Sequence, residues 1–86
     1  MDKAEAIIKV AEMAEPVKQL DKTIKALKQL NSPLRIAVYG TGTVVTIDGL
    51  SEEDMHFIKS GLVSLLDFKR NVQVEKLQDF IKEELK

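Results

Sequence analysis

Apolar residues in the first third of the chain recur at alternating steps of four and three positions. The members of this run are Ala6, Val10, Met13, Val17, Leu20, Ile24 and Leu27. Side chains three and four residues apart lie on one face of a helix, and this spacing is the heptad pattern of a coiled-coil seam. The pattern therefore predicts a helix over residues 2–30 with a single apolar seam.

Pro16 lies within this seam and allows two interpretations. A proline inside a helix removes one backbone donor and crowds the carbonyl group four residues earlier, so either one helix bends here or two helices meet in a tight turn. We favour the bend, because residues 3–30 contain no Gly, Asn or Ser and the heptad phase continues across the proline.

A helix over residues 2–30 would be too long to be covered by its own chain. It would measure roughly 43 Å, whereas a compact chain of this size has a radius of gyration of about 12 Å. We therefore expect part of the seam to pack against a second copy. The predicted oligomer interface consists of Val10, Met13, Val17, Leu20, Ile24 and Leu27.

The middle of the chain has the pattern of a β-hairpin. Asn-Ser-Pro at 31–33 ends the first helix, because the residue before a proline is pushed out of the helical region. Residues 34–48 then hold two alternating runs around Gly-Thr-Gly-Thr at 40–43, and a two-residue turn at 41–42 sets their register. The predicted pairs are Val38 with Val45, Ile36 with Ile47, Tyr39 with Val44, Ala37 with Thr46 and Arg35 with Asp48. Since an isolated hairpin is marginal in water, it should lie against helices, pair at its edge with another copy, or do both.

The last part of the chain is predicted to form two helices, over residues 51–70 and 73–85. Ser51 is a good N-cap and Asp54 can complete a variant of the capping box. The apolar phase slips around Asn71, which either breaks or bends the helix there. The residues predicted to face the core are Met55, Ile58, Leu62, Leu65 and Leu66, followed by Val74, Leu77, Ile81 and Leu85. The expected fold is a single α+β domain over residues 1–86 in the order α-β-β-α-α.

Composition supports a small soluble protein that self-associates. The chain has 86 residues, of which 44% are hydrophobic and 31% charged, with a net charge of -1. A chain this short buries only about 60 to 65% of its unfolded surface, so a partner copy would add to a thin core. Without cysteine, and with a charged N-terminus instead of a signal peptide, we expect a cytoplasmic protein without a membrane span.

Few residues are candidates for catalysis or metal binding. His56 is the single histidine, and we interpret it as a solvated helix residue or a contact between helices. Segment 40–43 leads into a strand and lacks the helix N-terminus of a phosphate-binding loop, so we interpret it as a turn. The acids Glu52, Glu53 and Asp54 occupy a first helical turn, where they stabilise the helix dipole. We expect no enzyme activity, no metal and no cofactor.

A lysine stripe provides the clearest candidate for ligand binding. Lys18, Lys22, Lys25 and Lys28 recur every three or four residues, which places them on one helix face. Such a stripe is usually solvated, and the alternative is a surface that binds an anion. Arg35 and Tyr39 share one hairpin face and could add a guanidinium and an aromatic ring, although Arg35 can equally pair with Asp48. The predicted ligand-binding residues are Arg35, Tyr39, Lys18, Lys22 and Lys25.

The segment from Leu34 to Leu66 resembles short accessory proteins of bacteriophages and prophages of Gram-positive bacteria. It consists of a hairpin, LRIAVYGTGTVVTI, followed at once by DGLSEEDMHFIKSGLVSLL. The resemblance implies inhibition of a host defence component, sequestration of a nucleotide signal without cleavage, or regulation of phage genes in the host cytoplasm. It includes no motif from which site residues could be transferred.

These observations favour a non-enzymatic, homo-oligomeric binding protein. It would sequester a small anionic or nucleotide ligand at its subunit interfaces. A protein-interaction module that inhibits a host protein is the first alternative. A nucleic-acid-binding regulator is the second, and the net charge of -1 argues against it because such proteins usually carry a basic excess.

Overall fold

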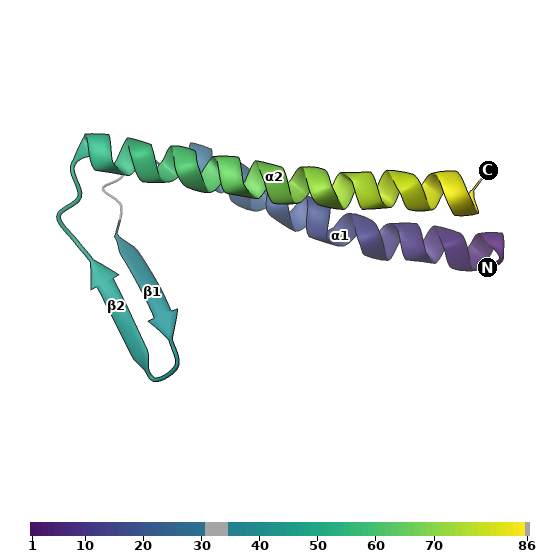
Figure 1. Cartoon of the computed structure of the whole chain (residues 1–86), viewed down its shortest axis with the longest axis horizontal. Helices are drawn as coiled ribbons and strands as arrows, with labels where there is room; N and C mark the ends of the chain where they lie inside the picture. Colours follow the sequence, from purple (N-terminus) through teal and green to yellow (C-terminus); the bar gives the residue numbers. More distant parts are fainter. Residues whose placement is uncertain (31–34, 86) are drawn as a thin grey trace.

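The computed structural model describes residues 1–30 and 35–85. They form two long helices and one β-hairpin, in the order α1 (Lys3–Lys28), β1 (Ile36–Gly40), β2 (Thr43–Ile47) and α2 (Glu52–Glu84). The two helices lie side by side and antiparallel, with both chain termini at one end and the β-hairpin at the other (Figure 1). The predicted α+β class is confirmed. The predicted helix end at 31–33 lies outside the described residues.

Helix α1 is continuous through Pro16, so a single helix is confirmed. It begins at Asp2, whose Oδ1 accepts a hydrogen bond of 2.8 Å from the backbone N–H of Glu5. Lys25 and Lys28 lie in its last turn, where cations complement the negative end of the helix dipole.

The prediction of two C-terminal helices was wrong, because α2 is one helix of 33 residues that includes Asn71. Residues 62–86 contain neither Gly nor Pro, and a single Asn does not stop a helix whose neighbours favour it. The predicted capping box at its start is confirmed. The Ser51 Oγ accepts a hydrogen bond of 3.0 Å from the Asp54 backbone, and an Asp54 carboxylate oxygen accepts one of 3.1 Å from the Ser51 backbone.

The helices pack through the heptad seam of α1. Ala6 and Ile24 are buried, and the other seam residues are half-buried. Because α2 is the one element that α1 contacts among the described residues, the seam packs against α2 of its own chain. This contact accounts for the partial burial of the seam, and packing of the seam against a second copy stays a prediction. The half-buried residues of α2 at heptad spacing are Lys59, Val63, Leu66, Arg70, Gln73, Leu77 and Phe80.

Three residues predicted to face the core of the chain, Leu62, Leu65 and Ile81, are exposed instead. The reason is that the seam of α2 includes polar residues. Arg70 and Gln73 occupy seam positions, and the Arg70 Nε donates a hydrogen bond to the Asp21 carboxylate of α1. The apolar residues of α2 alone therefore indicate a face of the helix that differs from the face packed against α1.

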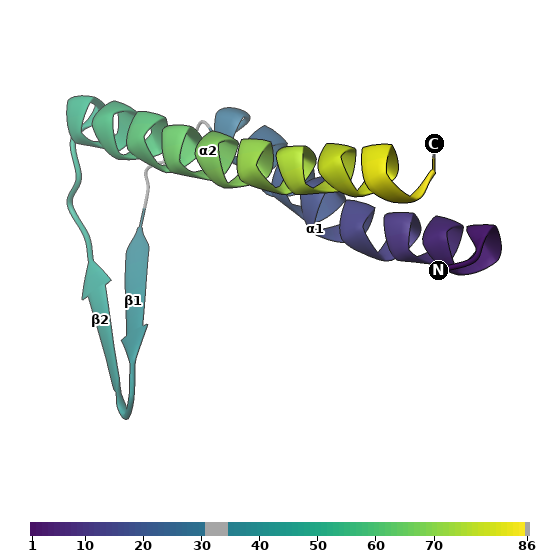
Figure 2. The same cartoon turned by 45° about the vertical axis from the view of Figure 1, so that its right-hand side comes forward.

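The β-hairpin has the predicted register. Its pairs run from Ile36 with Ile47 to Gly40 with Thr43, which leaves a two-residue turn. Gly42 in this turn has a φ of 74°, a conformation that side chains other than glycine rarely adopt. Within residues 1–30 and 35–85, the hairpin packs against neither helix, and it projects from the end of the helix pair as the arm of a hook (Figure 2).

The whole chain is elongated, with extents of 55 × 30 × 16 Å. Its radius of gyration is 17.8 Å, against about 12 Å for a compact chain of this length. Its accessible surface is 6825 Å², against about 5,100 Å² for a compact monomer of its mass. Within the described residues, neither α1 nor α2 combines the length and apolar character needed to cross a membrane.

Candidate functional site

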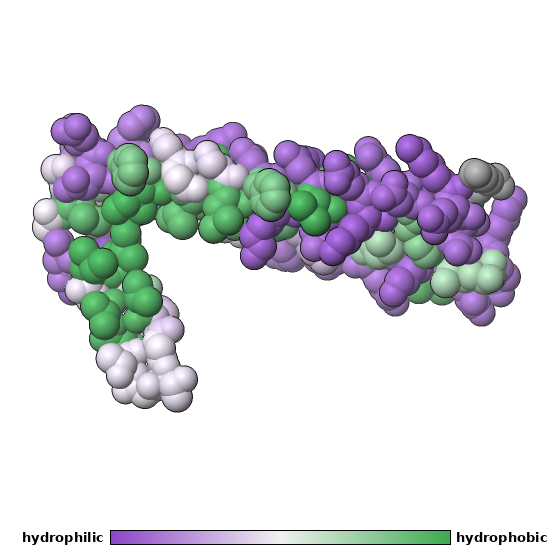
Figure 3. All heavy atoms as spheres, in the orientation of Figure 1, coloured by the Kyte–Doolittle hydropathy of each residue, from purple (hydrophilic) through white to green (hydrophobic). Residues whose placement is uncertain are grey.

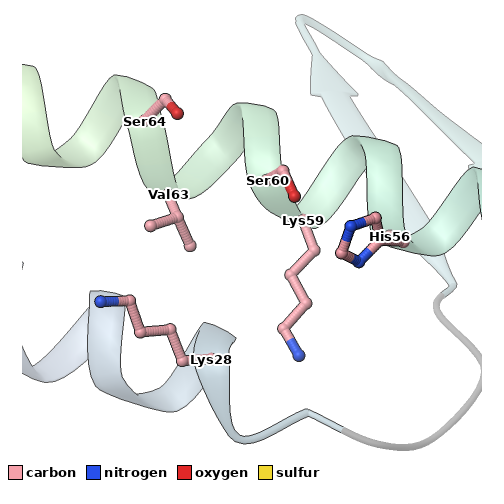
Figure 4. A pocket seen from close by; sticks show the side chains of 6 residues that line it. All are labelled: Lys28, His56, Lys59, Ser60, Val63 and Ser64. Atoms are coloured by element: carbon pink, nitrogen blue, oxygen red, sulfur yellow. The ribbon is translucent and has the colours of Figure 1, made fainter.

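A shallow groove lies where the last turn of α1 approaches the first half of α2. Its volume is about 380 Å³, and it opens to solvent. The residues that line it are Lys28, His56, Lys59, Ser60, Val63 and Ser64, and we call this site the basic groove (Figure 4). Lys28 belongs to α1 and the other five belong to α2, so the groove exists because the two helices pack together.

The α2 residues of the basic groove share one side of the helix. They occupy positions 56, 59, 60, 63 and 64, which are separated by three or four residues and therefore lie one above another. In Figure 4 the side chains of Lys28 and Lys59 occupy the space between the two helices, and His56 lies beside Lys59. Packing of α1 against α2 thus brings two ammonium groups and an imidazole ring to one place.

Lys59 is the best-anchored cation of the groove. It is half-buried, and its Nζ donates a hydrogen bond of 2.9 Å to the carbonyl oxygen of Leu30. Leu30 lies just past the C-cap Gln29, so this bond ties the residue that follows α1 to α2. An ammonium group carries three donors, and Leu30 accepts one of them. Lys59 can therefore hold Leu30 and still donate to a ligand.

The electrostatic character of the groove is cationic. Lys28, Lys59 and His56 contribute nitrogen atoms, Ser60 contributes a hydroxyl donor, and no carboxylate is among the lining residues. The hydroxyl group of Ser64 lies on the side of α2 away from α1 (Figure 4). Ammonium and hydroxyl donors are the groups that bind phosphate or carboxylate oxygens. Because most of these side chains are exposed, water and salt weaken each contact, and one groove can supply only a moderate affinity.

The predicted ligand-binding residues do not form a common site in this chain. Lys18, Lys22 and Lys25 lie on the exposed side of α1, outside the lining of the groove. Arg35 lies 2.8 Å from Asp48, measured from Nε to Oδ1, which is the cross-strand pair considered as its alternative role. Tyr39 is exposed on the β-hairpin. Since the described hairpin packs against neither helix, the three lysines of α1 stay apart from Arg35 and Tyr39.

Sequence reasoning missed Lys59, Ser60 and Ser64 as residues of the groove, and it considered His56 without assigning it to a binding site. A signal was present, because polar residues recur at these positions along one side of α2. It was not decisive, since the fifth lining residue of that helix is Val63 and the partner, Lys28, is distant in the sequence. The lysine stripe included Lys28, yet the sequence could not show which of its members lies beside α2.

Comparisons and a search for metal ligands add no further assignment. No protein family, no curated protein and no solved structure matches this chain. In the part of the chain that the structure describes, no group of three or more His, Asp or Glu side chains is arranged to hold a metal ion. The candidate function therefore depends on the chemistry of the basic groove and on the exposed surface.

Proposed function

We propose that this chain is a non-enzymatic binding protein that works as a homo-oligomer and sequesters a small anionic ligand of the nucleotide type. The observation that carries the proposal is the basic groove, which Lys28, Lys59, His56 and Ser60 line without a carboxylate (Figure 4). A phosphate group would match these donors. Several copies in one assembly would multiply the positive charge near the ligand.

Retention of the ligand, without cleavage, is the activity that this groove supports best. Within the described residues, no hydrogen bond joins His56 to Ser60 or Ser64, so the groove holds no nucleophile that is paired with a base. The resemblance of residues 34–66 to phage accessory proteins supports sequestration of a host nucleotide signal as the biological use of such a site.

Calorimetric titration of the protein with inorganic phosphate and a panel of mono- and dinucleotides tests this proposal. We expect binding of at least one nucleotide, weakened about tenfold or more in the Lys28→Gln, Lys59→Gln double variant, because charge-assisted hydrogen bonds are lost. The matched control is Lys18→Gln, Lys22→Gln, which removes the same charge from the exposed side of α1 and should change the affinity less than about twofold. Circular dichroism verifies that both variants stay helical.

Two outcomes would contradict the proposal. One is the absence of heat for every ligand with the unaltered protein. The other is an equal loss of affinity in both double variants, which would mean that net charge and not the basic groove attracts the ligand.

A docking module for a host protein is the second candidate function. The exposed apolar side chains of the β-hairpin and of α2 favour it, because surfaces of this kind mark sites of protein contact. A chain that stays monomeric and retrieves one specific protein from host lysate would favour this candidate over the first.

A further inference from the structure

The β-hairpin has one aliphatic face that residues 1–30 and 50–85 do not cover. The cross-strand pairs Ile36 with Ile47 and Val38 with Val45 lie on this face. Val38 and Val45 are 55% and 53% exposed, and among the described residues neither helix packs against the hairpin. A two-stranded hairpin without a packed face is marginal in water, so this face requires a partner.

Helix α2 has a second apolar surface that stays exposed in the described part of the chain. It consists of Phe57, Gly61, Leu62, Leu65 and Phe68, and we call it the Gly61 face. Phe57 and Phe68 are 80% and 68% exposed, although large aromatic side chains are usually covered. Phe57, Gly61 and Phe68 lie three or four residues from Ser60 or Ser64, so the Gly61 face adjoins the serine edge of the basic groove.

Gly61 at the centre of this face is not explained by the fold of the single chain. A glycine inside a helix costs roughly 0.5–1 kcal/mol relative to alanine. A Cβ atom added at Gly61 would meet nothing within 4 Å, so the chain itself leaves room for alanine. A residue without a side chain lets another chain approach the helix closely. The glycine at this position therefore indicates that the Gly61 face is a contact surface.

The exposed area also matches the requirement of an assembly. The accessible surface of 6825 Å² exceeds that of a compact monomer by about 1,700 Å². A stable interface buries about 800 Å² per partner, so this excess is enough for a reciprocal contact. Figure 3 shows apolar surface along the hairpin and along the neighbouring part of the helix pair, on the inner side of the hook.

We propose that the aliphatic face of the β-hairpin of one copy covers the Gly61 face of a second copy, and that the contact is reciprocal in a twofold dimer. This inference rests on the self-association in the proposed function and names the surfaces that produce it. The two hooks interlock, so each copy contributes a hairpin and receives one.

Light scattering coupled to size-exclusion chromatography, applied to two neighbouring hairpin variants, tests this contact. Val45→Asp places a charge on the aliphatic face and should shift the dimer to monomer, raising the dissociation constant at least about a hundredfold, because an unpaired charge would be buried. Thr46→Asp places the same charge on the opposite face of the same strand and should leave the mass unchanged. Equal behaviour of the two variants would overturn the proposal.

Gly61→Ala distinguishes a Gly61 that faces water from a Gly61 in the dimer contact. The two cases predict different effects on dimer dissociation. If Gly61 faced water, alanine would stabilise the helix and leave association unchanged. At a close contact, the added methyl group should weaken the dimer about tenfold or more. A variant that gains stability without any change in dissociation would overturn the proposal.

Disulfide formation between single-cysteine variants tests the contact without relying on a variant that could fail to fold. The chain contains no cysteine, so a mixture of Val38→Cys and Leu65→Cys proteins should form a cross-linked heterodimer on mild oxidation. A mixture of Val38→Cys and Gln78→Cys proteins is the control and should not. If the unaltered chain is a monomer, the proposed self-association fails as well. If it is an oligomer that does not form the predicted cross-link and whose mass is unchanged by Val45→Asp, only the proposed contact between the hairpin and the Gly61 face fails.

Discussion

Arg70 occupies a position in the seam of α2 where an apolar residue would be usual. Its guanidinium spans the helix pair to the Asp21 carboxylate, and both side chains stay partly exposed. An exposed pair of this kind contributes about 0.2–1 kcal/mol. Its larger effect is to select the register of the helix pair, because only one register places Arg70 beside Asp21.

Pro16 reduces the stability of α1 without interrupting it. A proline in a helix interior costs about 3 kcal/mol relative to alanine, and part of this cost is offset because proline also restricts the unfolded chain. We predict that Pro16→Ala raises the free energy of unfolding by about 2 kcal/mol in urea denaturation followed by circular dichroism. The position is exposed, so the smaller side chain leaves no cavity.

A loss of stability in Pro16→Ala would contradict a continuous α1. It would mean that the chain needs the restricted backbone of proline at this position, as in a turn between two helices. Thr23→Ala is a suitable control, because Thr23 is exposed in the same helix and its hydroxyl group bonds the Gln19 carbonyl. This control should change stability by less than about 0.7 kcal/mol.

At the scale of elements, the β-hairpin could be predicted from the sequence and the continuity of α2 could not. Hairpin register follows from local rules, since the glycine turn and the alternating side chains select a single pairing. The seam of α2 depends on a distant partner. Arg70 and Gln73 are half-buried because α1 lies there, and nothing in their immediate sequence indicates this. The apolar residues alone therefore indicated a break near Asn71.

Asn71→Ala tests whether α2 is one helix. Asn71 is exposed inside the helix, and alanine has the higher helix propensity, so we predict a gain of about 0.5 kcal/mol in the free energy of unfolding. At a turn between two helices the same substitution would destabilise the protein, because asparagine tolerates the backbone conformations that turns require. Urea denaturation distinguishes the two signs.

The packing partner of the α1 seam could not be predicted from the sequence. A heptad pattern indicates that a helix has an apolar partner, but not whether that partner belongs to the same chain. Here α2 covers the seam, and the unpartnered apolar surface is found on the β-hairpin and on the Gly61 face instead. The basic groove could not be predicted for a related reason, because it forms between Lys28 and residues of a helix far along the chain.

At the scale of the whole molecule, the chain is a hook with little interior of its own. In the described residues, Ala6 and Ile24 are the buried apolar residues, and one is the small side chain of alanine. Such a core supplies little hydrophobic stabilisation against the entropy lost on folding. A second copy that covers the β-hairpin and the Gly61 face would provide the missing burial, so we expect the chain to self-associate.

Absolute mass in solution, measured by light scattering coupled to size-exclusion chromatography, is the first test of self-association. We expect a mass at an integer multiple of the 9.7 kDa chain, and the proposed reciprocal contact predicts twice that value. The mass should fall toward one chain on dilution, with a loss of helical signal, if folding and association are coupled. A monomer that stays fully folded at high concentration would contradict self-association.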